Sequence, residues 1–380
     1  MEYLFYKYYK YLVLDKHKIN HNEDLYSIFY NNIFKYLVFF INDYRTKEKL
    51  KGNNPEDRYK YFNNIYIDVC NHINSLYPNL FNDLDKRISD YLNYTEEIKH
   101  NFSLDKYDLA EKKFISCDDV NIINIKCLGD FHNGKCVVKV ILSNKKTLIY
   151  KPHNMNNYEC YNEILKWINE NLHIDFYTLK IFNRVNYSWV EDISNNNSIY
   201  NKNDFYYKLG ILYCLAYVLK ISDLHYENLY AKNDTPIILD LEAFGSVDLM
   251  GDFLKNKSQK EIRKMILNSV LSSGLLPVNN SPYMFGGDVS GTFGGKFKIK
   301  VDKIINEFTD NIRIKRVIEN IEKTNHLASK NIMDIFNYLS VILSGFENSY
   351  KLILDNKEYF KLMIERYALL LNTRILFRNT

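Results

Sequence analysis

The sequence lacks a hydrophobic run long enough to cross a membrane. Its longest nearly apolar segment, LGILYCLAYVL at 209–219, is well short of the roughly 20 residues that a bilayer requires, so we expect a buried helix there. The N-terminus, MEYLFYKYYKYLVLDKHK, mixes charged and apolar residues every few positions and has no uninterrupted secretory core. These absences predict a cytoplasmic protein without a membrane span.

A surplus of charge is also missing. The 50 basic and 46 acidic side chains leave a formal net charge of +4. Such a balance produces no global field that would draw the protein onto nucleic acid or anionic lipid. We therefore expect no nucleic-acid partner. With 46% hydrophobic residues, a chain of 380 residues can bury a sizeable core, which predicts two lobes or two domains.

Paired cysteines are absent as well. The six cysteines lie far apart and form no CxxC pair: Cys70, Cys117, Cys127, Cys136, Cys160 and Cys214. This spacing favours reduced thiols in the core over disulfides or a structural zinc site.

The pattern of apolar residues changes along the chain and indicates an α+β fold. Residues 1–110 place apolar side chains three and four positions apart, which predicts a helical N-terminal region without a catalytic motif. Residues 111–195 contain β-branched runs, a polar turn, an amphipathic helix at 156–172 and further strand-like sequence. Strand, strand, helix, strand is the order of a kinase small lobe. Residues 196–380 are expected to form a mostly helical large lobe.

The strongest chemical signal is the segment SDLHYENLYAKNDTPIILDLEAFG at 222–245. Asp223 and Asn228 are five residues apart, and Asp240 follows the apolar strand TPIIL. In kinases, a catalytic-loop Asp accepts the substrate hydroxyl proton, an Asn five residues later binds Mg²⁺, and a later Asp binds Mg²⁺ again. The polar turn KNDT lets the chain double back. The spacing predicts Asp223 as proton acceptor and Asn228 and Asp240 as magnesium ligands.

ATP phosphates need a lysine in addition to these residues. Lys151 ends the strand TLIYK just before the amphipathic helix, which is the place of the kinase small-lobe lysine. Either Glu159 or Glu163 on that helix would orient the lysine. Glu242 is either a third metal-site oxygen or a cap on the next segment. ATP and Mg²⁺ are thus the expected cofactors.

Plainer interpretations remain open for two segments. DLHYEN is compatible with a polar turn in which Asp223 caps a helix, the backbone satisfies His225, and Asn228 is left-handed. GGDVSGTFGG at 286–295 lacks the lysine of a P-loop and is expected to be either a mobile loop lining the substrate site or a surface turn. The order D-x-H-x-x-N differs from the H-R-D of ordinary protein kinases and is closer to lipid kinases and small-molecule phosphotransferases.

Several motifs resemble the dehydratase domain, a DUF4135-like region, of the class II lanthipeptide synthetases, the LanM family. They are TLIYKPH, YSWVEDI, YYKLGILYCLAYVLKISDLHYENLYAKNDTPIILDLEAF, SSGLLPV and DVSG, and the resemblance runs from about residue 125 to the end. It implies a lipid-kinase-like bilobal fold. It also implies that Ser and Thr of a ribosomal precursor peptide are phosphorylated with ATP and Mg²⁺, and that the phosphate is then eliminated to give dehydroalanine or dehydrobutyrine.

The resemblance also implies roles for individual residues. Those matching the phosphorylation site are Lys151, Asp223, His225, Asn228, Asp240 and Glu242. Those matching the elimination site are Asp130 and His132 in GDFHNG, and Arg374 and Thr380 in NTRILFRNT. Elimination requires an acid or base and a partner for the departing phosphate, which suits a histidine and an arginine. By themselves, Asp130 and His132 look like turn residues and Arg374 like a surface charge.

The sequence departs from the family where it ends. The zinc-dependent cyclase of full synthetases does not follow, so we expect a fragment, a split enzyme or a decayed copy whose large lobe is incomplete. The expected partners are a precursor peptide with its leader and a separate lanthionine cyclase. Two other functions stay open: a lipid-kinase-like or small-molecule phosphotransferase without elimination, and a catalytically inactive pseudo-dehydratase that binds the peptide or a synthetase. The intact lysine, aspartates and asparagine argue against the last.

Overall fold

The computed structural model describes residues 3–116, 120–129, 131–132, 134–193, 199–246, 256–277, 287–323, 327 and 332–374. The chain divides into two compact units. Unit 1 comprises Met1–Pro152 and Lys300–Ile318, and unit 2 comprises His153–Ile299 and Glu319–Thr380.

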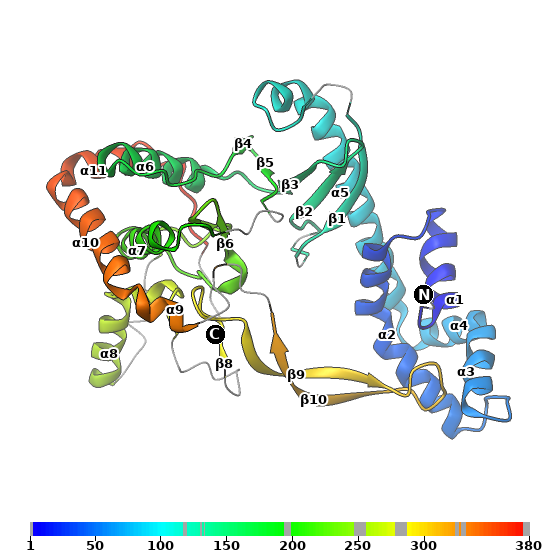
Figure 1. Cartoon of the computed structure of the whole chain (residues 1–380). Helices are drawn as coiled ribbons and strands as arrows, with labels where there is room; N and C mark the ends of the chain where they lie inside the picture. Colours follow the sequence, from blue (N-terminus) through cyan, green and yellow to red (C-terminus); the bar gives the residue numbers. More distant parts are fainter. Residues whose placement is uncertain are drawn as a thin grey trace. The chain divides into compact units, whose positions relative to one another are not determined.

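Helices fill the N-terminal part of unit 1, as the periodicity predicts (Figure 1). They are Tyr6–Tyr9 (α1), the π-helical turn Lys10–Asp15 (η1), Glu23–Thr46 (α2), Pro55–Asn64 (α3), Tyr66–Leu76 (α4) and Pro78–Glu111 (α5). Asparagine side chains begin two of them: Asn22 accepts from the Asp24 amide at α2, and Asn54 accepts from the Asp57 amide at α3. The helices enclose a core rich in tyrosine and phenylalanine rings.

A small antiparallel sheet belongs to unit 1, as expected. Its strands are Ile122–Cys127 (β1), Val138–Leu142 (β2) and Thr147–Lys151 (β3), paired in that order. Helix α5 is hydrogen-bonded to this region, because the Tyr94 hydroxyl donates to the Cys136 carbonyl over 2.6 Å and the Asn101 amide donates to the Tyr150 hydroxyl over 2.9 Å. The sheet is thereby fixed to the helices of the same unit.

Unit 2 is built around a buried helix. Its helices are Asn156–Leu172 (α6), Lys202–Val218 (α7), Lys257–Leu267 (α8), Ile332–Asn337 (α9), Leu339–Asp355 (α10) and Lys357–Glu365 (α11), with 3₁₀ turns Tyr226–Asn228 (η2) and Val270–Ser273 (η4). Its short strands are Ile181–Asn183 (β4), Ser188–Glu191 (β5), Leu229–Lys232 (β6), Thr235–Ile238 (β7) and Gly287–Asp288 (β8). Helix α7 is buried along most of its length.

Helices α7 and α10 approach very closely (Figure 1). Gly210 on α7 faces the backbone of α10, where a Cβ atom would lie only 1.9 Å from the Ile342 carbonyl oxygen. Gly345 on α10 makes the reciprocal approach, since its Cβ would lie 2.0 Å from the Tyr207 carbonyl oxygen. Glycine at both positions lets the two backbones touch.

A long hairpin corrects the expectation that residues after 196 are mostly helical. Strands Lys296–Ile305 (β9) and Arg313–Glu322 (β10) have ten residues each. Exposed and half-buried residues alternate along most of β9, which is the period of a strand. Residues 300–318 of this hairpin belong to unit 1. Near its tip, Asp310 is fully buried and accepts from the Arg58 guanidinium over 2.6 Å.

The cysteines are free thiols, as predicted. Cys70, Cys136, Cys160 and Cys214 are buried and Cys127 is half-buried, whereas Cys117 lies outside the described residues. Within the described part of the chain, no helix has both the length and the apolar character needed to cross a bilayer.

Candidate active site

The loop that follows α7 carries the first candidate residues. The Ser222 amide donates to the Ala243 carbonyl over 3.1 Å, and the Gly245 amide donates to the Leu219 carbonyl over 3.1 Å. These bonds fasten the start of the loop to the segment that follows β7. The residues at 222–228 and at 240–245 are therefore held together by backbone contacts.

Asp223 has a strained backbone. It is exposed and left-handed, with φ of 62°. Such a conformation is unfavourable for a residue other than glycine and is concentrated at functional sites. The Asn228 side-chain amide donates to the Asp223 carbonyl over 2.8 Å, which closes the loop. The plainer interpretation of DLHYEN placed the left-handed residue at Asn228, and this is wrong because Asp223 takes that conformation.

His225 has a structural contact within the loop. Its Nδ1 accepts from the Glu227 amide over 3.3 Å and thereby caps the turn η2. An accepting Nδ1 carries no proton, so this contact corresponds to an imidazole with Nδ1 unprotonated. The backbone thus occupies one ring nitrogen, as the plainer interpretation expected, and leaves Nε2 for any chemical role.

The β6–β7 hairpin brings Asp240 to Asn228. Its turn contains Asn233 and Asp234, both left-handed with φ of 48° and 56°, as a tight two-residue hairpin requires. At the open end of the hairpin, the Leu239 amide donates to the Asn228 carbonyl over 2.7 Å. The chain therefore doubles back as expected, and Asp240 follows directly on the residue that contacts Asn228.

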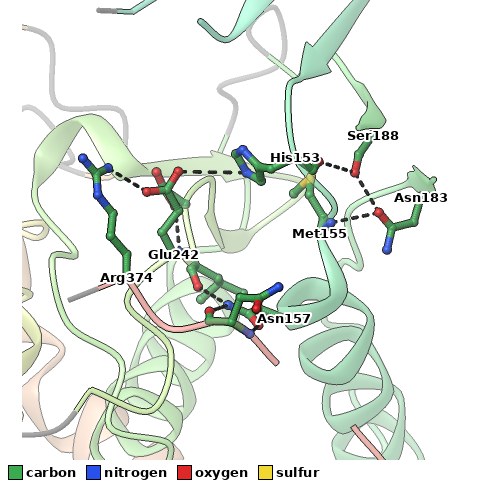
Figure 2. Close-up of polar contacts among 10 residues, drawn as sticks. His153, Met155, Asn157, Asn183, Ser188, Glu242 and Arg374 are labelled. Atoms are coloured by element: carbon green, nitrogen blue, oxygen red, sulfur yellow. Dashed lines mark hydrogen bonds and ion pairs between the residues drawn. The ribbon is translucent and has the colours of Figure 1, made fainter. Parts of the chain in front are cut away.

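Glu242 joins this region to the C-terminal segment (Figure 2). The Arg374 Nη1 donates to Glu242 Oε2 over 2.7 Å, and the Arg374 amide donates to the Glu242 carbonyl over 2.7 Å. His153 Nε2 lies 4.0 Å from Glu242 Oε1. Glu242 raises the pKa of Arg374, and the Asp240 and Asp223 carboxylates raise it further. Arg374 is thus within electrostatic reach of both proposed phosphorylation carboxylates.

The glycine-rich segment packs against the loop. The Tyr226 amide donates to the Val289 carbonyl over 3.1 Å, and Ser290 and Thr292 are only 5% and 2% exposed. A Cβ on Gly291 would lie 2.5 Å from the Leu224 carbonyl oxygen. The alternative of a surface turn is therefore wrong for residues 290–295, whereas Gly287 is exposed and Gly286 lies outside the described residues.

Lys151 and His132 are the described candidates that belong to unit 1. Lys151 ends β3 and is 8% exposed. His132 is exposed in the connection from β1 to β2, where its backbone forms an isolated bridge with Lys135. Asp130 lies outside the described residues, as does Thr380 in unit 2.

The two glutamates proposed as partners of the lysine differ in their surroundings. Glu163 accepts from Arg366 Nη1 over 2.9 Å and from the Tyr367 hydroxyl over 2.7 Å. Glu159 is exposed one turn earlier on α6. Glu163 is thus already engaged by two donors of its own unit.

The donor set fits a magnesium ion that also binds phosphate. Among the described residues, no group of three or more His, Cys, Asp and Glu side chains is arranged to hold a metal ion. Asn228 and Asp240 offer an amide oxygen and a carboxylate, which are oxygen donors of the kind that Mg²⁺ uses together with phosphate oxygens and water. The residue types match that hard cation better than zinc.

Sequence reasoning missed two residues of this region. His153 is the last residue of the motif TLIYKPH, which also contains Lys151. The motif itself could therefore have identified His153 as a candidate. Asn157 hydrogen-bonds to Leu241 and to Asn372 (Figure 2). No local pattern marks Asn157, because its partners are 84 and 215 residues away.

Comparison with known proteins shows similarity along most of this chain. A domain of unknown function, DUF4135, matches residues 77–380. The lacticin 481/lactococcin biosynthesis protein LcnDR2 of Lactococcus lactis subsp. lactis is 34% identical over 391 residues, which cover 96% of this chain and 42% of the relative. The chain thus spans less than half the length of that relative. The chain belongs to the DUF4135 family, as its motifs indicated.

Proposed function

We propose that this chain modifies a ribosomal precursor peptide in lanthipeptide biosynthesis, by phosphorylating Ser and Thr residues and then eliminating the phosphate. One observation carries this proposal. Leu239 and Ala243, which flank the acidic segment Asp240–Glu242, are bonded to the loop of Asp223 and Asn228, and Glu242 is bonded to Arg374. One region therefore contains groups suited to transferring a phosphoryl group and also a group suited to binding a departing phosphate.

The fold supports the phosphorylation step. The order β2, β3, α6, β4, β5 matches a kinase small lobe, and α7 followed by the loop matches the start of a large lobe. We assign the small lobe to residues 111–195 and the large lobe to 196–380, in a lipid-kinase-like arrangement preceded by the helical region 1–110. In this assignment Lys151 ends the third strand of the small lobe, as in kinases.

Each residue then has a role in phosphorylation. ATP would supply the phosphoryl group and leave as ADP, and a bound Mg²⁺ would neutralise the charge of the phosphates. Asp223 accepts the proton of the Ser or Thr hydroxyl, and Asn228 and Asp240 hold the metal. Lys151 contacts the nucleotide phosphates, with Glu159 orienting it. His225 and Glu242 complete the site from the loop and from the metal side.

We assign the elimination step to Arg374, which pairs with Glu242, and to three further residues. A base removes the α-proton of the phosphorylated residue, the Cα and Cβ atoms form a double bond, and phosphate leaves with the electrons of the Cβ–O bond. Arg374 is a forked donor suited to the departing phosphate. Asp130 and His132 are the proposed acid and base residues of this step, and Thr380 is proposed to act in the same step as Arg374.

Mass spectrometry tests both steps. The full chain is incubated with ATP, Mg²⁺ and the lacticin 481 precursor peptide, with its leader, and the products are weighed. Loss of water from the peptide indicates the complete reaction, whereas gain of phosphate without loss indicates a kinase that stops at transfer. Absence of both products indicates an inactive binding protein or a different substrate class.

Asp223→Asn is the matched test of the loop. Because proton acceptance contributes on the order of 10² to 10⁴ in rate, both phosphorylation and dehydration should fall by that factor. Glu227→Gln is the control, since Glu227 is an exposed residue of the same loop that pairs with Lys323. An Asp223→Asn protein that dehydrates at the wild-type rate would remove Asp223 from catalysis.

A further inference from the structure

Asn157 connects two segments of the candidate active site. It lies in the first turn of α6 and is 8% exposed. Its Nδ2 donates to the Leu241 carbonyl over 2.8 Å and to the Asn372 carbonyl over 2.6 Å, and its Oδ1 accepts from the Asn372 amide over 3.0 Å (Figure 2). A buried carboxamide needs such partners. These three bonds all go to the backbone of two segments that are far apart in sequence.

Both segments carry residues with proposed chemical roles. Leu241 stands between Asp240 and Glu242, and Asn372 is two residues before Arg374. A single side chain therefore holds the backbone that presents the acidic residues and the backbone that presents the arginine.

Helix α6 offers a firm base for this side chain. Next to Asn157, the Tyr158 hydroxyl donates to the Ile238 carbonyl over 3.1 Å, so α6 contacts the chain on both sides of Asp240. The start of the helix is held in turn by Asn183, whose Oδ1 accepts from the Met155 amide over 2.8 Å (Figure 2). The position of Asn157 is thus set by hydrogen bonds of its neighbours.

The two segments depend on Asn157 to different degrees. The acidic segment is also held by the Leu239 amide on Asn228 and by the Ser222 amide on Ala243. Among the described residues, the other bonds of residues 372–374 run from Thr373 to Phe244 and from Arg374 to Glu242, so without Asn157 these residues are attached only to the acidic segment and its neighbour. Loss of Asn157 should therefore displace Arg374 more than Asp240.

We propose that Asn157 is a positioning residue that sets the place of Arg374 relative to the Asp240–Glu242 segment, and that elimination depends on it more than phosphorylation does. This inference rests on the proposed function. Asn157 acts only through Leu241 and Asn372. A misplacement of about 1 Å can cost on the order of 10² in rate, so a displaced Arg374 is enough to slow phosphate departure.

The activity test compares Asn157→Ala with Asn169→Ala. Asn169 is a matched control on the same helix, because its amide donates to the Phe176 carbonyl over 2.9 Å and its Oδ1 accepts from the Phe176 amide over 2.8 Å. With the lacticin 481 precursor peptide, ATP and Mg²⁺, Asn157→Ala should raise the ratio of phosphorylated to dehydrated peptide by roughly 10-fold or more. Asn169→Ala should keep the wild-type ratio. A wild-type ratio in Asn157→Ala would overturn the inference.

Amide hydrogen exchange tests the positioning without any substrate. In Asn157→Ala, the Asn372 amide should exchange about 5-fold faster or more, because its hydrogen bond to Asn157 is lost, and the Arg374 amide should exchange faster because its segment is held less firmly. In Asn169→Ala, the Phe176 amide should change instead. Unchanged exchange at both Asn372 and Arg374 would also overturn the inference. If the wild-type protein forms neither product, the proposed function fails, and hydrogen exchange alone then decides whether Asn157 holds the two segments together.

Discussion

Arg374 contacts Glu242 twice, through its guanidinium and through its backbone amide, each over 2.7 Å. The two residues are 132 positions apart in sequence. In the proposed function, Glu242 lies near the metal ion during phosphorylation and Arg374 binds the phosphate that leaves during elimination. One ion pair would then connect the sites of the two reactions. A phosphate that binds Arg374 must compete with the Glu242 carboxylate for the same guanidinium.

Replacing Arg374 with lysine tests this arrangement. Arg374→Lys keeps the positive charge but loses the fork that binds two oxygens, so dehydration should fall by about 10² while phosphorylated peptide accumulates. Mass spectrometry of the peptide over time measures both species. Arg366→Lys is the control, since the Arg366 guanidinium pairs with Glu163. Equal loss of both steps in Arg374→Lys would contradict a role confined to elimination.

His132 gives a separate test of elimination from unit 1. His132→Ala should accumulate phosphorylated peptide, because removal of a general acid or base costs on the order of 10² to 10⁴ in rate. Phosphate gain and water loss are counted by mass spectrometry. His100→Ala, at an exposed position on α5, should leave both steps unchanged. Unchanged dehydration in His132→Ala would exclude His132 from the step and leave the kinase assignment intact.

Alkaline pH should destabilise the protein. Burial raises the pKa of Cys70 from 9.0 to about 12, and burial also raises the pKa values of Tyr9 and Tyr26 from 10.0 to about 12. The unfolded chain releases these protons near pH 9 to 10, whereas the folded chain holds them until about pH 12. The free energy of unfolding should therefore be fully retained below about pH 9 and fall as the pH rises towards 12.

Urea denaturation at a series of pH values measures this effect. The urea concentration at the midpoint should decrease steadily above about pH 9. In Cys70→Ala, the free energy of unfolding should depend less steeply on pH, by up to about 1.4 kcal/mol per pH unit. A midpoint that stays constant between about pH 8 and pH 10.5 would show that these groups titrate normally in the folded protein.

The close contact of α7 and α10 predicts a strong effect of a single methyl group. Gly210→Ala would place a Cβ 1.9 Å from the Ile342 carbonyl oxygen, so the helices must separate. We expect a loss of about 1–3 kcal/mol in the free energy of unfolding, measured by urea denaturation. Ser344→Ala, at an exposed position on α10, should change it by less than about 0.5 kcal/mol. Equal midpoints for the two variants would contradict the close packing.

Several features of the candidate site follow from local sequence. The amphipathic helix over 156–172 matches the bounds of α6, the strand TLIYK matches β3, and the predicted strand TPIIL is one residue longer than β7. The turn KNDT makes a tight hairpin because Asn233 and Asp234 tolerate left-handed backbone. A short hairpin necessarily returns the chain, and for this reason the proximity of Asp240 to Asn228 was predictable from spacing alone.

One local signal was read incorrectly. The stretch KFKIKVDKII at 296–305 alternates lysine and apolar residues, which is the period of a strand, although we expected this region to be mostly helical. The pattern was strong enough to predict β9. Its pairing with β10 and the division of the hairpin between two units depend on contacts that the pattern does not contain.

By itself, the sequence determined the helices, the loop DLHYEN and the hairpin behind it, because periodicity and turn residues act over a few positions. Tertiary structure alone decided that Arg374 contacts Glu242, that Asn157 binds Leu241 and Asn372, and that the glycine-rich segment packs on the loop. These contacts join residues far apart in the chain. They form because a buried carboxamide or a backbone group must find a partner once the helices have packed, and that packing decides which partner is within reach.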